Sequence, residues 1–250
     1  MFNNHHQIPT FFITGEKSIR FSFGNEINKE RFETVRCFHL FVEEQWGLLV
    51  QEIVPSYHTV TVYLCKNYSV ETINIQKLLT MWCESHQTEE KVNTSLLSIP
   101  VCYEAPFCED MDRISEYTGL APQEIIQLHS QTVYTVYMIG FLPGFPYLGE
   151  LPVALKVPRL DKPRVTVPKG TVGIGGSQTG IYPISSPGGW NIMGRTPIDI
   201  FDPKRAEPFL LQAGSQLKFV PISYEEYLNY EKKIAESEVD IHQLVRGVEA

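Results

Sequence analysis

The chain has 250 residues, of which 43% are hydrophobic and 20% are charged, as in ordinary globular proteins. This composition excludes an intrinsically disordered chain. Lys and Arg number 21 against 29 Asp and Glu, so the formal net charge is −8. We therefore do not expect a broad surface for nucleic acid or for an anionic membrane. At roughly 100–200 residues per domain, the length fits one large domain or two small ones.

Targeting and metal-binding signals are missing from the sequence. The first residues lack the basic and apolar regions of a signal peptide, and no apolar run approaches the ~18 residues of a transmembrane helix. We therefore expect a cytoplasmic protein that does not associate with a membrane. The five cysteines contain no C-x-x-C pair, and no histidine spacing is typical of metal ligands. The sequence thus predicts neither a disulfide framework nor a metal site.

The first part of the chain has the hydrophobic patterns of regular helices and strands. The predicted elements are a strand, a helix, two strands and a second helix, at 18–23, 27–46, 48–54, 60–64 and 70–86. This β-α-β-β-α order is five-sixths of a split βαβ, or ferredoxin-like, unit. Residues 96–99 are interpreted as its last strand or as a linker. A polar run before them predicts domains at 1–95 and 96–250.

Composition changes near residue 140, because residues 140–197 hold eleven Gly and nine Pro. Such a segment is typical of short strands joined by many turns, and it predicts a β-barrel or a sandwich. Two short helices precede it, at 109–118 and 122–130. Their acidic residues favour an αα-hairpin over a DNA-binding helix-turn-helix. The predicted strands and the final helix lie at 133–139, 164–167, 171–174, 198–201, 216–222 and from 224 onward.

The glycine-rich segment 170–180 is a candidate anion cradle, because glycines let backbone N–H groups approach a ligand. It matches neither the dinucleotide motif nor the Walker A motif. A barrel with tight turns is an equally good interpretation. Gln178 and Thr179 are candidates for specific polar contacts in either case. Arg195, between Gly194 and Thr196, is a candidate for binding a carboxylate or a phosphate.

Aromatic and basic residues mark further candidates. Trp190 is expected either in a pocket wall or in the core. The loop with Phe141, Phe145 and Tyr147 is rigid and apolar, and it either binds a partner or covers the mouth of the barrel. The basic stretch 156–169 has a local charge of +4, which steers anions or is simply solvated. His129, at the end of a short helix, is either structural or a proton-transfer group.

The second half of the chain carries several long motifs in order between residues 137 and 202. These motifs are Tyr137–Phe141, Pro143–Leu148, Pro158–Arg159, Pro163–Arg164, Val167–Pro168, Gly170, Gly173–Gly176, Gln178–Pro183, Ser186–Trp190, Gly194–Pro197 and Phe201–Asp202. Together they resemble the family of the 5-oxoprolinase B subunit (KipI) and allophanate hydrolase subunit 1. The resemblance extends to Gly15–Glu16 and Val54–Tyr57 and thus spans nearly the whole chain.

The resemblance implies an α+β protein, with an N-terminal ferredoxin-like α/β domain followed by a cyclophilin-like β-barrel domain. It also implies one of three roles. The first is the B subunit of a bacterial ATP-dependent 5-oxoprolinase, which opens 5-oxoproline to glutamate together with the C and A subunits. The second is inhibition of a sporulation histidine kinase. The third is a part in urea-processing enzymes. Prolyl isomerase activity does not follow from a cyclophilin-like fold.

We favour the enzyme subunit, inactive alone, because the motifs belong to the wider family. On this interpretation His129 moves a proton and Arg195 stabilises developing charge as the catalytic pair. The expected substrate-binding residues are Arg164, Gln178, Thr179, Tyr182 and Trp190. The aromatic loop with Phe141, Phe145 and Tyr147 would meet a partner. ATP with Mg²⁺ would be shared with the partner subunits, because no ATP motif lies in this chain.

One loop departs from the family pattern. Members have a Gly-Gly pair after Cys-Tyr and a Gly-Pro pair before the acidic helix. This chain has Glu104-Ala105 and Cys108-Glu109 at those places. The loss of these glycines removes backbone conformations that a closely approaching ligand uses.

Overall fold

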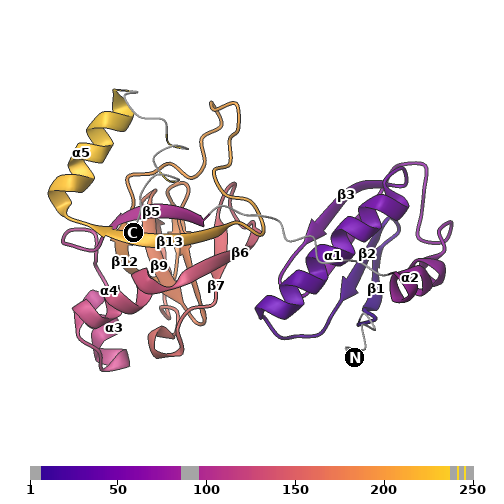
Figure 1. Ribbon diagram of the computed structural model, residues 1–250, viewed down its shortest axis with the longest axis horizontal. Coiled ribbons are helices and arrows are strands. Elements are labelled where there is room, and N and C mark those ends of the chain that lie inside the picture. Colours follow the sequence, from indigo (N-terminus) through magenta and orange to yellow (C-terminus); the bar gives the residue numbers. More distant parts are fainter. Residues whose placement is uncertain (1–6, 86–95, 237–240, 242–244, 246–250) are drawn as a thin grey trace. The chain divides into compact units, whose positions relative to one another are not determined.

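A computed structural model describes residues 7–85, 96–236, 241 and 245 of the chain. The chain divides into two compact units, residues 1–92 and 93–250 (Figure 1). The predicted domain boundary follows residue 95, and that residue lies outside the described residues. None of the described helices combines the length and apolarity needed to cross a membrane.

The N-terminal unit is an antiparallel four-stranded sheet with two helices. Its strand order is β1-β2-β4-β3. The elements are β1 (Thr10–Gly15), β2 (Ser18–Ser22), α1 (Lys29–Trp46), β3 (Val50–Pro55), β4 (Thr59–Leu64) and α2 (Ile75–Glu84). The predicted order β-α-β-β-α is confirmed for β2 to α2. Because β4 lies between β2 and β3, these two strands run parallel to each other and α1 connects them, which is a split βαβ arrangement.

The fourth strand of this sheet comes from the N-terminal side of the chain. Strand β1 was not predicted from the sequence, and it pairs with β2. The prediction that residues 96–99 form the last strand of this unit, or a linker, is wrong. They belong to β5 (Leu96–Cys102), a strand of the barrel. The pattern around Leu96 to Ile99 predicts burial, but it does not reveal which sheet the strand will join.

The core of this unit is aromatic. The ring of Phe38 in α1 lies 5.0 Å from that of Phe21, 5.2 Å from that of Phe23 and 5.1 Å from that of Trp82. All four side chains are fully buried. Edge-to-face rings add roughly 0.5–1.5 kcal/mol per pair to the free energy of burial. Phe38 therefore joins the sheet to both helices.

Asparagine side chains determine where both helices begin. Asn28 Oδ1 accepts a hydrogen bond from the Arg31 amide at 2.9 Å, and Asn74 Oδ1 accepts one from the Lys77 amide at 2.9 Å. An N-cap of this kind satisfies one of the amides that a helix start leaves free. The second helix thus begins at Ile75 rather than at the predicted residue 70.

The second unit is a closed barrel. Its strand order is β10-β7-β6-β13-β5-β12-β9. The barrel strands besides β5 are β6 (Val133–Ile139), β7 (Pro146–Gly149), β9 (Thr171–Gly175), β10 (Gln178–Ile181), β12 (Asn191–Arg195) and β13 (Gln216–Ile222). Strand β13 pairs in parallel with β5 and antiparallel with β6. The predicted α+β class is confirmed, as is the choice of a barrel over a sandwich.

Other elements of the barrel unit lie outside the closed sheet. Strands β8 (Arg164–Val167) and β11 (Ser186–Gly188) form a separate ribbon, and Val153–Leu155 forms a short 3-10 helix. The helices are α3 (Met111–Thr118), α4 (Pro122–Gln131) and α5 (Tyr224–Ala235). Gly119 ends α3 in the left-handed conformation, at φ 72°, and Ser223 with Glu226 forms a capping box before α5.

The predicted strand at 198–201 is wrong. This segment makes only an isolated bridge, between Phe201 and Phe209. Ile198 and Ile200 are buried in the barrel core, which produces the alternating pattern. Pro197 and Pro203 bound the segment and lack amide donors for a ladder. The alternation of apolar and polar residues in this segment thus results from packing against the barrel and not from strand pairing.

We expect Phe38→Ala to destabilise the N-terminal unit by about 3–5 kcal/mol, because a buried ring is replaced by a cavity. Chemical denaturation followed by tryptophan fluorescence measures this, since Trp46 and Trp82 lie in that core. Leu40→Ala on the same helix is the control. Leu40 is 43% exposed, and its loss is expected to cost less than about 1 kcal/mol. Equal losses for the two variants would contradict this account of the core.

Candidate functional site

Four aromatic side chains gather on the barrel unit outside its main core. Phe145 precedes β7, Tyr147 lies in β7, Tyr182 follows β10 and Trp190 precedes β12. The ring of Phe145 lies 5.3 Å from that of Tyr182 and 5.5 Å from that of Trp190, and both pairs are edge-to-face. Tyr147 lies 5.0 Å from Phe145 and 6.2 Å from Trp190. We call these four residues the aromatic cluster. It brings together two predicted substrate-binding residues and two predicted partner-binding residues.

Glycines allow the aromatic cluster to pack against backbone. A Cβ atom at Gly175 would lie 2.8 Å from Cδ1 of Trp190, and one at Gly188 would collide with the hydroxyl of Tyr182. A side chain at either place would displace a ring. Two of the glycines in the predicted motifs therefore serve close packing of aromatic rings.

Arginines lie beside this cluster. The guanidinium carbon of Arg159 lies 5.6 Å above the Trp190 ring, a cation–π arrangement. Burial raises the pKa of Tyr147, and the positive charge of Arg159 opposes this shift. Burial also raises the pKa of Tyr182, against a hydrogen bond with the Trp190 backbone and the charges of Arg159 and Arg164. Protonated phenols add no negative charge beside Arg159, and an exposed guanidinium attracts anions.

Arg159 is exposed and forms no ion pair with any of the described residues. Sequence reasoning did not select it as a site residue. Two signals could have found it: its place in the basic stretch 156–169 and its place in the Pro158–Arg159 motif. What the sequence did not reveal is that it lies over Trp190, thirty-one positions later in the chain.

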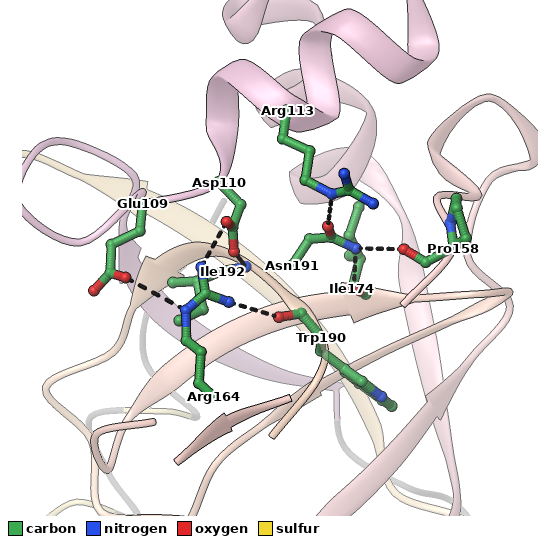
Figure 2. A network of polar contacts seen from close by, with 9 residues as sticks. All are labelled: Glu109, Asp110, Arg113, Pro158, Arg164, Ile174, Trp190, Asn191 and Ile192. Atoms are coloured by element: carbon green, nitrogen blue, oxygen red, sulfur yellow. Dashed lines mark hydrogen bonds and ion pairs between the residues drawn. The ribbon is translucent and has the colours of Figure 1, made fainter. Parts of the chain in front are cut away.

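Arg164 is held by carboxylates instead of facing a ligand. Its Nη2 lies 2.6 Å from Oδ1 of Asp110, and its Nε lies 3.6 Å from Glu109. Arg164 also donates to the Trp190 carbonyl at 3.5 Å. Figure 2 shows these contacts converging on the guanidinium. In this conformation Arg164 ties β8 to the start of α3, and its role in substrate binding stays a prediction.

Asp110 and Asn191 extend this polar network. Oδ2 of Asp110 accepts a hydrogen bond from the Ile192 amide at 2.6 Å. Asn191 accepts from Arg113 Nε at 2.9 Å and donates to the carbonyls of Pro158 and Ile174 at 3.0 and 3.2 Å (Figure 2). The network joins α3, β12 and the segment that carries Arg159. It thereby positions Arg159 over the aromatic cluster.

His129 and Thr179 lie in the barrel core, away from solvent. His129 has no exposed surface, and its ring stacks on Phe219 at 4.5 Å. Nδ1 lies 2.8 Å from the hydroxyl of Tyr103, and Nε2 lies 2.9 Å from Oγ1 of Thr179. The Thr179 hydroxyl donates to the Gly173 carbonyl at 3.1 Å. It therefore accepts from Nε2–H, and Tyr103 donates to Nδ1. Both ring nitrogens and both hydroxyls thus have partners.

Burial lowers the pKa of His129 to about 3. The ring is thus neutral at physiological pH, and its hydrogen-bonding capacity is used within the core. This environment is typical of a structural histidine. The proton-transfer role of His129 stays a prediction, and the arrangement of its partners does not favour it.

Arg195 lies at the other end of β12 from Trp190. Its guanidinium carbon is 4.6 Å from the ring centre of Phe107, and its charge lies near Tyr227 of α5. Phe107 belongs to the loop that departs from the family pattern. In that loop Glu104 accepts a hydrogen bond from the Tyr224 amide at 3.1 Å, next to the start of α5. Arg195 thus lies in a separate environment from the aromatic cluster, and its catalytic role stays a prediction.

The remaining predicted residues have distinct environments. Gln178 is buried at the start of β10. Phe141 is 71% exposed at φ 69°, whereas Phe145 is 2% exposed. The predicted partner-binding loop therefore presents Phe141 to solvent and buries Phe145. Among the described residues, no three His, Cys, Asp or Glu side chains form a group that could hold a metal ion.

The glycine-rich segment 170–180 is a hairpin of the barrel. Residues Gln178 to Ile181 of β10 pair with Val172 to Gly175 of β9, and β9 also pairs with β12. Backbone amides in such ladders are occupied by neighbouring strands. The segment does not fit the phosphates of a nucleotide. The interpretation as a barrel hairpin therefore explains these glycines better than an anion cradle.

We expect Asp110→Ala to lower the free energy of unfolding by about 2–4 kcal/mol, because it leaves the Arg164 guanidinium and the Ile192 amide without their partner. Glu109→Ala is the matched control. Glu109 is 52% exposed and 3.6 Å from Arg164, so its loss is expected to cost less than about 1 kcal/mol. Urea denaturation of both variants measures this. A loss below about 1 kcal/mol for Asp110→Ala would show that this network does not stabilise the site.

We expect the His129 ring to stay neutral, with its proton on Nε2, as the pH falls from 7 to about 4. An ordinary histidine takes up its second proton near pH 6.5. Nitrogen NMR of the imidazole measures the tautomer and the titration. Because the folded pKa is depressed, the unfolded chain binds more protons between pH 6.5 and about 3, so stability falls as the pH falls through this window. Titration near pH 6.5 would contradict the buried environment.

Comparison with known proteins places the chain in a family. Residues 9–211 match the family described as the carboxyltransferase domain, subdomain C and D. The 5-oxoprolinase B subunit of Bacillus subtilis is 35% identical over 228 residues, covering 88% of this chain and 95% of the relative. The 5-oxoprolinase B subunit of Escherichia coli O157:H7 is 42% identical over 172 residues, covering 69% of this chain and 78% of the relative.

Solved structures share the fold. The crystal structure of TTHA0988 matches with a TM-score of 0.70 and 30% identity; the match covers 83% of this chain and 40% of that one. The Kluyveromyces lactis urea carboxylase matches with a TM-score of 0.72 and 19% identity, over 90% of this chain and 23% of that one, and it supports the fold alone. This chain thus spans less than half of either solved chain. The extent and identity of the sequence matches show that it belongs to the carboxyltransferase subdomain C and D family, which includes the B subunit of 5-oxoprolinase.

Proposed function

We propose that this chain is the B subunit of an ATP-dependent 5-oxoprolinase. The reaction converts 5-oxoproline, ATP and two water molecules into glutamate, ADP and phosphate. One water adds across the lactam C–N bond, and the other is taken up in ATP hydrolysis. The observation that carries this proposal is the 35% identity to a 5-oxoprolinase B subunit across 95% of that relative. The chain would act with the C and A subunits and would be inactive alone.

On this proposal the exposed guanidinium of Arg159, which lies over Trp190 of the aromatic cluster, binds the substrate. The substrate has a carboxylate and a five-membered ring that contains an amide. Arg159 offers an exposed guanidinium for the carboxylate, and guanidinium–carboxylate pairs are among the stronger charge-assisted contacts. The hydroxyls of Tyr147 and Tyr182 stay protonated and add no negative charge beside the carboxylate. The Trp190 ring positions the guanidinium through the cation–π contact.

The nucleotide is proposed to bind to the partner subunits. The glycine-rich hairpin of this chain does not fit its phosphates, as described above. When bound, ATP would activate the lactam carbonyl oxygen by phosphorylation. This chain would hold the substrate carboxylate at Arg159, whereas Arg195 lies in a separate environment beside Phe107, and its predicted catalytic role is tested with the variant below. Gln178, Thr179 and Arg164 would act by holding the barrel around the site.

We further propose domains at 1–95 and 96–250. The first would be a ferredoxin-like domain whose edge strand comes from β1, and the second a cyclophilin-like barrel. The split βαβ arrangement of β2, α1 and β3 around β4 supports the first assignment. The closed seven-stranded barrel supports the second.

The test is to co-express the tagged chain with the C and A subunits and to assay glutamate release from 5-oxoproline with ATP. Arg159→Ala is expected to lower kcat/KM about tenfold or more, mainly through KM, because it removes binding of the carboxylate. Lys162→Ala in the same basic segment is the control, with less than about a twofold change. Arg195→Ala is assayed beside them and is expected to lower kcat. Full activity of Arg159→Ala would overturn this binding role.

A second function is favoured by one observation. Phe141 is 71% exposed on a loop between β6 and β7, and its backbone at φ 69° is strained, a combination found at loops that carry binding functions. The partner would be another subunit or, on the inhibitor hypothesis, a histidine kinase. Capture of a histidine kinase, with loss of its autophosphorylation and no glutamate release by the co-expressed subunits, would favour the inhibitor.

A further inference from the structure

The free edge of the N-terminal sheet is unusually apolar. Strand β1 lies at one edge and β3 at the other (Figure 1). The β1 segment Thr10–Gly15 contains no charged residue and no proline, whereas β3 contains Glu52 and ends at Pro55. Phe12 and Ile13 of β1 are 56% and 60% exposed. Natural edge strands usually carry charges or proline to prevent pairing with another chain. By this criterion β3 is protected and β1 is not.

The backbone of β1 has a defined set of outward-facing groups. On the inner side of β2, the Leu64 amide donates to the Lys17 carbonyl and the Phe23 amide donates to the His58 carbonyl. The amides and carbonyls of Ile19 and Phe21 therefore face β4, and those of Arg20 and Ser22 face β1. Their partners on β1 are Phe12 and Thr10. It follows that Phe11 and Ile13 direct their N–H and C=O groups away from the sheet.

The sequence of β1 is nearly symmetric about Phe12. It runs Thr10, Phe11, Phe12, Ile13, Thr14. In an antiparallel pair of two copies with a two-fold axis at Phe12, each Phe11 lies opposite Ile13 of the second copy. Those two residues carry the outward N–H and C=O groups, so they form a hydrogen-bonded pair. Phe12 then lies opposite Phe12 of the second copy as a non-hydrogen-bonded pair, in which side chains approach most closely.

We propose that this chain forms a homodimer through antiparallel pairing of β1 with β1 of a second copy, centred on Phe12. The pairing makes one continuous eight-stranded sheet. It is an interaction beyond the proposed enzymatic function and does not depend on it. The apolar pattern and the matching of outward hydrogen-bonding groups both select a second copy as the occupant of this edge.

A hollow beside β1 fits the same arrangement. It has a volume of about 470 Å³ and is lined by Phe11 and residues 71–76 at the start of α2. Phe11 lies on the helix-covered face, where its ring is 6.4 Å from that of Phe21. Directly opposite residues of an antiparallel pair share a face, so Ile13 of the second copy lies beside Phe11 and next to this hollow. Ile73, which packs at the margin of the core, would be covered by it.

The test measures the oligomeric state of the full chain by sedimentation equilibrium. A single strand pair buries a small area, so we expect a dissociation constant of about 1–100 μM. Phe12→Lys places like charges directly opposite each other and is expected to weaken the dimer at least about tenfold. Ile13→Pro removes an outward N–H that pairs with none of the described residues, and it is expected to weaken the dimer to the same extent. Val54→Lys, on an exposed position of β3, is the control and is expected to leave the dimer unchanged.

Mixing the Phe12→Lys variant with a Phe12→Glu variant tests the register. Opposite charges then face each other across the axis, and the mixed dimer is expected to form more tightly than either variant alone. Circular dichroism verifies that each variant is folded. The proposal is overturned if the wild-type chain is monomeric at about 300 μM, or if its dimer survives both Phe12→Lys and Ile13→Pro in folded variants. A dimer whose strength the charge pairing does not restore would place the axis elsewhere and reject this register.

Discussion

The carboxylate of Asp110 is the contact on which the candidate site depends. It accepts a hydrogen bond from the Ile192 amide of β12 and pairs with Arg164 of β8. These three elements are far apart in the sequence, and a partly buried charge joins them at the start of α3. Removal of such a charge costs far more than removal of an exposed ion pair, because its partners stay desolvated. The segment that carries Arg159 is bound to the same network, because the Pro158 carbonyl accepts a hydrogen bond from Asn191.

Close packing in the aromatic cluster fixes the position of the ring over which Arg159 lies. Close approach at Gly175 and Gly188 lets Trp190 and Tyr182 lie against backbone. Burial raises the pKa of both tyrosines, and Arg159 remains exposed above the indole ring. The result is one exposed guanidinium over an aromatic ring in a protein with a net charge of −8. Local placement of charge, and not the overall balance, determines what such a surface attracts.

The candidate site could be predicted only in part. The motifs drew attention to Trp190, Tyr182 and Arg164, and all three lie in or beside the aromatic cluster. The position of His129 at the end of a helix predicts a proton-transfer group. Its ring is instead enclosed by Phe219 and Tyr103 in the barrel core. The sequence does not indicate a role for Arg159, because Trp190, the ring it contacts, is distant along the chain. Spacing along the chain indicates local structure, whereas a site is made by contacts between distant segments.

The sequence by itself determined the local elements and the family. Periodic apolar residues indicate most of the helices and strands, and polar caps such as Asn28, Asn74 and Ser223 fix where helices begin, because these effects act within a few residues. Tertiary structure alone decided which strands pair. The apolar run after Leu96 became a barrel strand, and β1 became the edge of the N-terminal sheet. Strand pairing is non-local, since backbone hydrogen bonds accept any extended partner and only the assembled core selects among them.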